Sequence, residues 1–422
     1  MTGIPLASSL RARNVPVSSL HRTFRSVEEH ERLSGKQVIR LHVGEPYFTP
    51  PVEAIEALAR SARDHRTSYT SAEGLLELRE ALVHKLNEKN RIPATVDRVF
   101  VSPGSTQGLV AILLATADPG AEILLPEIHW PIYLQQSLLA GLRPSFYRLK
   151  PDFRISPDAV LSAASPRTRI LLINSPANPT GAILDQALLS TLLSLARKHN
   201  WIVISDEAYE DFIYDGVHVS IASLEEGLPE NERRVFSVFT FSKSYAMTGY
   251  RLGYVVAPNA EAARALQVTQ EASIIAPSTP VQFAALAALG SYETVRSAAQ
   301  SLRAVRDSAL PALLDEGLLV ALPQGGWYVL LDLSSYDITA ERFAEPLLRE
   351  SGVAVSPASR FSVRARTTDQ KGALTLSANP RFRSFIRVAF CGPANEVAEG
   401  FKRIRESLGT LNVKERDESY AA

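Results

Sequence analysis

The sequence predicts an α/β protein, in which a large domain with a mostly parallel central sheet flanked by helices precedes a smaller α+β domain. In the first two thirds of the 422 residues, short apolar and β-branched runs alternate with amphipathic stretches, as parallel strands and their covering helices do. Beyond about residue 291, a long helical stretch is followed by short strands and another helix. The strands expected in the large domain are 98–101, 122–125, 170–173, 201–205 and 235–239, and its clearest helices are 107–117 and 184–199.

These patterns divide the chain into four parts. Residues 1–50 form an N-terminal arm that adds to the small domain, 51–290 the large domain, and 291–411 the small domain. In the small domain we expect one helix over 293–316, strands at 327–331 and 384–390, and a last helix ending at Leu408. Residues 412–422 are charged and poor in apolar side chains, so we expect a disordered tail.

The composition is that of a globular protein without a strongly charged partner. Lys and Arg number 45, as do Asp and Glu, so neither nucleic acid nor an anionic membrane is expected as the main partner. The one cysteine, Cys391, excludes an internal disulfide and a cysteine-based zinc site, and we expect it to be a small buried side chain; no metal site is predicted. No apolar stretch is long enough to span a bilayer, which indicates a cytoplasmic protein.

Polar and glycine-rich segments follow four of the expected strands. In parallel α/β sheets, ligands bind just beyond the carboxyl ends of the strands, so these segments should meet at one site. The segments are Gly104-Ser105-Thr106, the turn 174–181 with Asn178, Asp206-Glu207-Ala208-Tyr209, and Thr240-Phe241-Ser242-Lys243.

Lys243 carries the most specific signal. A single lysine is usually a solvated surface residue. Here, residues 240–243 are followed by Thr248-Gly249-Tyr250-Arg251-Leu252-Gly253-Tyr254, and this pattern resembles the cofactor-lysine motif of the class I/II aminotransferases, the fold-type-I pyridoxal-phosphate (PLP) enzymes. The resemblance runs from residues 41–46 (LHVGEP) to 386–390 (IRVAF), nearly the whole chain, with several separated motifs in the family's order.

The resemblance implies roles for the residues around the cofactor ring. Lys243 would hold PLP as a Schiff base and then move the substrate's α-proton. Asp206 would pair with the protonated pyridine nitrogen, which keeps the ring an electron sink. Asn178 and Tyr209 would hydrogen-bond its phenolic oxygen, and Trp130 would stack on its face. Taken alone, Asp206 is more often a helix N-cap, Asn178 a turn residue and Trp130 a core residue.

The phosphate and the substrate need further groups. A helix N-terminus with small residues can bind a phosphate through backbone amides. The residues that the resemblance assigns to the phosphate are Gly104, Ser105, Thr106, Thr240, Ser242 and Arg251, together with Tyr69 from a neighbouring subunit. The role of Tyr69 implies a homodimer with shared active sites.

Arg387 lies inside an apolar run, where an unpaired charge is costly to bury. The family uses this arginine to bind the substrate α-carboxylate, and Gly44, Asn178 and Trp130 would also contact the substrate. The alternative is an exposed arginine on an edge strand. Side-chain specificity is not predicted, although Arg360 could receive a second carboxylate or face water.

Two features depart from the family pattern. The family commonly has a glycine-rich turn before its substrate loop, but this chain has Ser356-Pro357-Ala358-Ser359-Arg360-Phe361-Ser362. In addition, the segment 362–385 is longer than expected, and such long segments are usually lids, binding loops or disordered regions. A lid and a disordered insertion both remain open.

The resemblance implies transamination between an L-amino acid and a 2-oxo acid by ping-pong chemistry. A second interpretation keeps the cofactor but changes the reaction to decarboxylation, β- or γ-elimination or replacement, cyclisation or oxidation, because the cofactor motifs would look the same. A third, a non-catalytic regulator, requires a DNA-binding module, and the segment before Gly44 is too short and too weakly basic for one.

Overall fold

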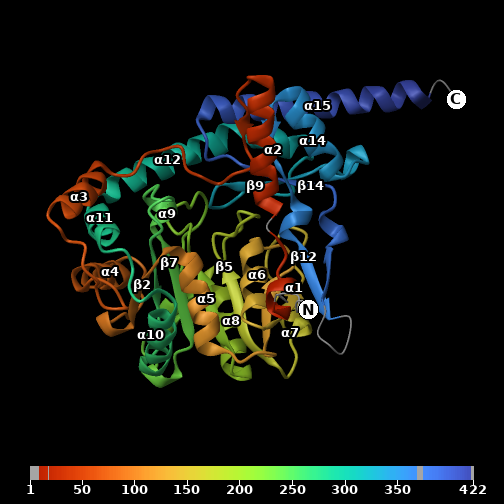
Figure 1. The fold of residues 1–422 in the computed structure, drawn as a ribbon. Coiled ribbons are helices and arrows are strands. Elements are labelled where there is room, and N and C mark those ends of the chain that lie inside the picture. Colours follow the sequence, from red (N-terminus) through yellow and green to blue (C-terminus); the bar gives the residue numbers. More distant parts are fainter. Residues whose placement is uncertain (1–8, 18, 368–373, 420–422) are drawn as a thin grey trace, which may run out of the picture.

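The computed structural model describes residues 9–17, 19–367 and 374–419. Its large domain is built on a seven-stranded sheet with the order β2-β8-β7-β6-β5-β3-β4, in which β8 alone runs antiparallel to its neighbours (Figure 1). This confirms the predicted mostly parallel sheet. The strands are β2 (Val99–Ser102), β3 (Glu122–Pro126), β4 (Arg143–Tyr147), β5 (Thr168–Asn174), β6 (Ile202–Asp206), β7 (Val235–Thr240) and β8 (Gly253–Val256).

Successive residues of the central strands enter two different cores, because side chains alternate between the faces of a strand. Ile170 and Leu172 of β5 pack into one core, whereas Leu171 and Ile173 pack into the other. The sheet is therefore buried on both faces, which explains its nearly continuous apolar runs.

Helices cover both faces of this sheet. Helices α5, α6 and α10 contribute to one core, and α4, α7, α8 and α11 to the other. Two of them are the predicted helices 107–117 and 184–199, with α5 beginning three residues earlier. The helices of this domain are α3 (Val52–Arg63), α4 (Leu76–Glu88), α5 (Gly104–Thr116), α6 (Pro131–Leu139), α7 (Pro157–Ala163), α8 (Gln186–His199), α9 (Phe241–Ser244), α10 (Ala260–Ile274) and α11 (Thr279–Leu289), with the short 3-10 helices η1 (Val96–Arg98), η2 (Ile221–Glu225) and η3 (Glu230–Glu232).

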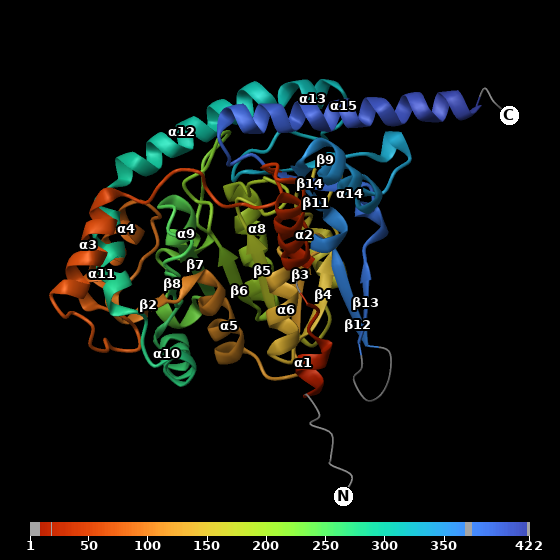
Figure 2. The ribbon, with the colours of Figure 1, turned by 45° about the horizontal axis from the view of Figure 1, so that its top comes forward.

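The smaller domain contains an antiparallel sheet with the order β11-β14-β9. Helix α12 reaches it from the side of α3 and α11 (Figures 1 and 2). Its elements are α12 (Tyr292–Ala309), α13 (Pro311–Asp315), β9 (Tyr328–Asp332), η4 (Ser334–Tyr336), α14 (Ala340–Ser351), β10 (Val353–Ala354), β11 (Ser356–Pro357), η5 (Ala358–Phe361), η6 (Pro380–Phe382), β14 (Phe385–Ala389) and α15 (Ala394–Ser419).

The N-terminal arm adds to this domain. It contains α1 (Leu10–Asn14), α2 (Ser19–Ser34) and β1 (Ile39–Arg40), and β1 pairs in parallel with β10. The proposed domain boundaries remain a prediction. No helix within the described ranges is both long and apolar enough to cross a membrane.

Two expectations for the C-terminal half require correction. The helix expected over 293–316 is two helices, because Pro311 cannot donate the backbone hydrogen bond that would continue α12 and instead starts α13. The tail expected to be disordered from 412 continues α15 to Ser419, since Lys, Glu and Arg are good helix formers and extend an existing helix readily. Residues 420–422 lie outside the described residues.

The insertion 362–385 forms an antiparallel hairpin of β12 (Val363–Thr367) and β13 (Leu374–Ala378), while residues 368–373 lie outside the described residues. The interpretation as a disordered insertion is therefore wrong for the described strands. The hairpin extends beside the large domain, near β4 (Figure 2).

Candidate active site

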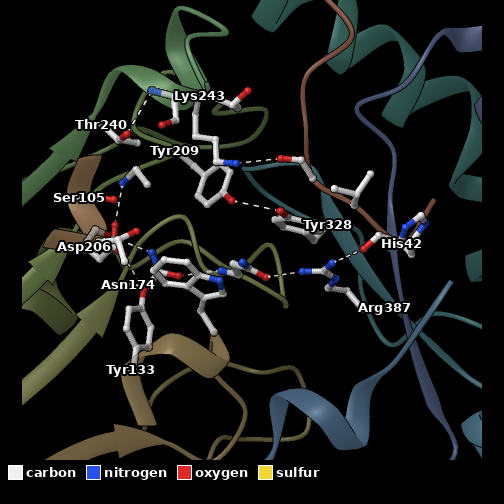
Figure 3. Close-up of a pocket in the computed structure, with 18 of the residues that line it drawn as sticks. His42, Ser105, Tyr133, Asn174, Asp206, Tyr209, Thr240, Lys243, Tyr328 and Arg387 are labelled. Atoms are coloured by element: carbon white, nitrogen blue, oxygen red, sulfur yellow. Dashed lines mark hydrogen bonds between the residues drawn. The ribbon is translucent and has the colours of Figure 1, made fainter. Parts of the chain in front are cut away.

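A cavity of about 250 Å³ lies at the carboxyl ends of β5, β6 and β7, between the two domains. Most of the predicted site residues line it, and they come from both domains and from the N-terminal arm (Figure 3). The predicted residues among its lining are Gly44, Ser105, Thr106, Trp130, Asn178, Asp206, Tyr209, Thr240, Ser242, Lys243, Arg251 and Arg387.

Lys243 reaches into this cavity from the short helix α9, directly after β7. Its Nζ donates a hydrogen bond to the carbonyl oxygen of Gly44 at 2.8 Å. The same nitrogen lies 5.9 Å from the ring centroid of Tyr209 and 5.4 Å from that of Trp327. The amine is therefore held between aromatic rings by one neutral oxygen, which a ligand can replace.

Asp206 is the last residue of β6 and is 3% exposed. Burial raises the pKa of its carboxyl group to about 6, although the Tyr133 hydroxyl and the Ala208 backbone N–H donate to its oxygens and oppose that rise. Among the described residues it forms no ion pair. A cation at its exposed edge would restore the charged form.

Tyr209 lies between Lys243 and the small domain. Its hydroxyl donates to that of Tyr328 at 3.3 Å, and burial raises its pKa well above the usual value. Tyr328 lies against Gly44, where an added Cβ would be 1.6 Å from the Tyr328 Oη. A residue with a side chain could not replace Gly44 without displacing Tyr328, which accounts for glycine at this position.

The N-terminus of α5 provides an anion-binding site. Its N-cap, Pro103, offers no side-chain hydrogen bond to the first turn, so the backbone amides there are available to a ligand. Gly104 has a positive φ of 76°, and a Cβ there would be 2.5 Å from Nη2 of Arg251. The guanidinium of Arg251 therefore lies directly over the first residue of the helix.

The other predicted phosphate ligands surround the same helix end. Arg251 donates to the carbonyl oxygen of Thr248 at 2.7 Å and approaches the Ser242 hydroxyl at 3.5 Å. The Thr240 hydroxyl caps α9 by accepting from the Ser242 backbone N–H at 3.1 Å. Backbone amides, hydroxyls and one guanidinium thus converge, which is the donor set that a phosphate monoester needs.

Arg387 is on β14, the central strand of the small sheet, and is 3% exposed, so the alternative of an exposed edge-strand arginine is wrong. Its guanidinium donates to the carbonyl oxygen of His42 at 2.6 Å and to Oδ1 of Asn178 at 3.3 Å. The rings of Tyr328 and Phe361 lie on it, with centroids at 4.3 and 4.2 Å from Cζ.

No carboxylate of the described residues pairs with this guanidinium, and its Nε has no partner there. Burial lowers the pKa of Arg387, but an arginine keeps its charge. A buried guanidinium with neutral partners only is a site for a carboxylate supplied by a ligand.

Asn178 and Trp130 line the same cavity as Arg387 and Asp206. The backbone N–H of Asn178 donates to Oδ1 of Asn174, which fixes the turn, and its side chain faces Arg387. Trp130 is the N-cap of α6 and contacts Tyr133 edge-on at 5.5 Å.

Some predicted residues lie elsewhere. Tyr69 is 82% exposed and does not line the cavity of its own chain. Arg360 lies in a separate cleft beside α2, where it donates to the Thr23 hydroxyl. Cys391 is buried as expected, and burial raises the pKa of its thiol to about 12.

Several cavity residues were not predicted. Tyr133 is three residues after Trp130, on the same face of α6, and Tyr328 follows Trp327, so helical spacing and an aromatic pair were available signals. His42 gave no such signal. Its buried ring nitrogens have no partner among the described residues, and burial together with the charge of Arg387 lowers its pKa to about 3, so the ring is neutral.

The comparison with protein families agrees with this geometry. The family model described as Aminotransferase class I and II matches residues 36–404. The chain belongs to this family. Its curated relatives include the aspartate/prephenate aminotransferase of Thermus thermophilus, 35% identical over 78% of this chain and 86% of that protein, and the aspartate aminotransferase of Pyrococcus abyssi, 37% identical over 77% and 84%.

Another relative of this aminotransferase is the bifunctional aspartate aminotransferase and glutamate/aspartate-prephenate aminotransferase of Petunia hybrida. It is 36% identical over 72% of this chain, and the match spans 64% of that longer protein. Among solved structures, the Thermus thermophilus aspartate aminotransferase with maleate matches with a TM-score of 0.84 at 30% identity, covering 95% of this chain and 99% of that one. The aromatic aminotransferase from Pyrococcus horikoshii matches with a TM-score of 0.80 at 31% identity, covering 92% and 99%.

The aminotransferase is a PLP-dependent enzyme, and its cavity fits that cofactor. The uncapped helix end under Arg251 suits the phosphate, the buried Asp206 suits a cationic ring nitrogen, and the amine of Lys243 lies within the same cavity. These three features are independent of the family match.

Proposed function

We propose that the aminotransferase moves the amino group of an L-amino acid to a 2-oxo acid, with Lys243 and Arg387 acting on the substrate. One observation carries the proposal: an amine and a buried guanidinium, which has no carboxylate partner among the described residues, face one cavity that also contains Asp206. The relatives, which are named as aspartate, prephenate and aromatic aminotransferases, support it.

The residues have separate tasks. When bound, the cofactor provides a cationic ring that withdraws electrons from the substrate Cα. Asp206 keeps that ring nitrogen protonated, because a buried carboxylate gains most from a fixed cation. Arg387 holds the α-carboxylate through its fork, and the Lys243 amine carries the proton to and from Cα. Asn178 and Tyr209 would hydrogen-bond the phenolic oxygen of the cofactor.

A half-reaction tests this proposal. The loaded enzyme is mixed with a panel of L-amino acids and no acceptor, and the cofactor is followed by absorbance. We expect stoichiometric conversion to pyridoxamine phosphate, reversed by a 2-oxo acid. Retention of the aldehyde form with release of ammonia or CO2 would instead indicate one of the other carbanion reactions.

We further propose a cytoplasmic homodimer with shared active sites, in which Tyr69 reaches the phosphate bound by its partner. Its high exposure supports this, and exposed Val52, Ile55 and Leu76 on the neighbouring helices α3 and α4 offer an apolar surface. Mixing inactive Lys243→Ala and Tyr69→Ala chains should restore activity, since each mixed dimer then has one intact site. No restoration, with mixed dimers demonstrated by mass, would contradict shared sites.

A further inference from the structure

The insertion that the sequence singled out is fastened to the other domain. We call residues 358–367 and 374–382, which comprise η5, β12, β13 and η6, the strap. The strap belongs to the small domain by sequence, yet three of its side chains bond to the end of β3 in the large domain. None of its described residues lines the cavity, so it is not a wall of the site.

The attachment point is Glu127, which directly follows β3 and is 1% exposed. Its Oε2 accepts from Nη2 of Arg364 at 3.1 Å and from Nδ2 of Asn379 at 2.8 Å. Its Oε1 accepts from Nη1 of Arg381 and from the backbone N–H of Leu149 at 2.9 Å. Three of the four donors come from the strap.

These contacts specify one position for the strap. The four hydrogen bonds use the acceptor capacity of the carboxylate, and the remaining donors of Arg381 bind the carbonyl oxygens of Leu149 and Lys150 at 2.8 and 2.9 Å. An apolar contact would hold the two domains together as well, but it would allow sliding. A buried carboxylate with two guanidinium groups has few alternative arrangements, because any slip leaves a charge unpaired.

The strap is connected to the substrate arginine through Phe361. The carbonyl oxygen of Phe361 accepts from the backbone N–H of His129 at 2.7 Å, two residues after Glu127. The Phe361 ring is fully buried and lies 4.2 Å from Cζ of Arg387. The segment that follows β3 thus holds the ring that packs against the guanidinium.

We propose that Glu127 is a positioning residue: by pinning the strap to the large domain it holds Phe361 against Arg387, so that the carboxylate site is preformed before substrate binds. The inference about Arg387 rests on its proposed role as the carboxylate ligand. The attachment of the strap by Glu127 does not.

Glu127→Gln tests the proposal, with Glu122→Gln as the matched control. Glu122 is also a buried carboxylate on β3, but its bonds go to Ser165 and Thr168 within the large domain. Three quantities are measured for each variant loaded with cofactor: hydrogen exchange of the strap amides, the Kd for maleate, which cannot be transaminated, and KM and kcat for the best amino acid.

For Glu127→Gln we expect strap amides to exchange at least tenfold faster, the Kd for maleate and KM to rise about tenfold or more, and kcat to stay within threefold. A higher KM with an unchanged kcat means that the substrate binds more weakly while the chemical step is unaffected. A general loss of structure would lower kcat as well. Glu122→Gln should change none of the three. If Glu127→Gln does not accumulate as folded protein, Arg381→Gln is the second variant. It removes one of the bonds between the strap and Glu127 by changing the more exposed of the two partners, and it should give the same pattern.

Unchanged exchange of the strap in these variants would overturn the attachment, and faster exchange with unchanged maleate binding would overturn the link to Arg387. Neither readout needs turnover. A wild-type enzyme that transfers no amino group would therefore refute the proposed function while the strap is still decided by exchange and binding.

Discussion

Arg387→Lys is the substitution that tests the carboxylate site most directly. The guanidinium is planar, is covered on its two sides by Tyr328 and Phe361, and keeps donors for a ligand while it holds His42 and Asn178. Lysine keeps the charge, but its ammonium group cannot stack between two rings or present two parallel N–H groups to a carboxylate. The variant therefore separates geometry from charge.

The expected loss follows from the burial of the pair. Truncating one partner of a buried charge pair costs about 2–5 kcal/mol, and we take about 3 for lysine because some attraction remains. At about 1.4 kcal/mol for each tenfold change, kcat/KM should fall roughly a hundredfold. The fall should lie mainly in KM, because the α-carboxylate is bound equally in the ground state and in the transition state.

The assay is steady-state kinetics with the best amino acid, together with the Kd for maleate and the cofactor absorbance. Arg360→Lys is the control, since Arg360 is a partly buried arginine of the same domain that lies in the other cleft. For Arg360→Lys we expect kcat/KM and the Kd for maleate to change no more than twofold. If Arg387→Lys binds maleate and substrate as tightly as the wild type with cofactor fully bound, Arg387 does not hold the carboxylate.

Other variants test the cofactor side of the cavity. Lys243→Ala should lose covalent attachment of the cofactor, measured by borohydride trapping and mass, and lose activity by about a thousandfold or more, while circular dichroism stays unchanged; wild-type turnover would rule out this lysine. Tyr133→Phe removes a 2.7 Å hydrogen bond to Asp206, a bond to a charged group worth about 1.5–3 kcal/mol. The cofactor Kd, titrated by absorbance, should rise about tenfold or more, and an unchanged Kd would contradict the pairing. In the cofactor-free protein, burial raises the pKa of Asp206 to about 6 from the ordinary value of 3.8 for an aspartate. Its neutral form is thus favoured by folding, and the free energy of unfolding should increase relative to Asp206→Asn by up to about 3 kcal/mol as pH falls from 6 to 4. If the difference in free energy of unfolding between the two proteins does not change over this pH range, the pKa of Asp206 is not raised.

The sheet and the cofactor side of the site could be predicted because their determinants are local. Each strand is an apolar run, and residues 104–106, 178, 206 and 240–243 each lie near the carboxyl end of such a run. Sheet geometry then brings these segments together without further information. To predict that Asp206 lies at this site, it was enough to assume that the strands run parallel.

The remaining contacts could not be predicted because they join residues far apart in the sequence. The hydroxyl of Tyr133 meets Asp206 over 73 residues, and Glu127 meets Arg381 over 254. Nothing in residues 362–385 indicates that their arginines pair with a carboxylate in another domain, so the insertion was open to interpretation as a lid or as disorder. The length of the last helix was also missed, because its charged composition suits an exposed helix as well as a coil.

Buried charges distinguish the structural parts of this aminotransferase from its site. Burial alone would raise the pKa of Glu210, four residues after Asp206 in the sequence, but Lys85 and Lys89 outweigh that effect and hold its pKa well below the usual range. In the described part of the chain Asp206 forms no ion pair, and burial raises its pKa. Arg387 likewise donates only to neutral oxygens among the described residues. By contrast, the buried Glu127 accepts from two arginines, Arg364 and Arg381. Asp206 and Arg387 face the same cavity, and neither has an opposite charge beside it among the described residues. A ligand that carries both opposite charges would pair them both.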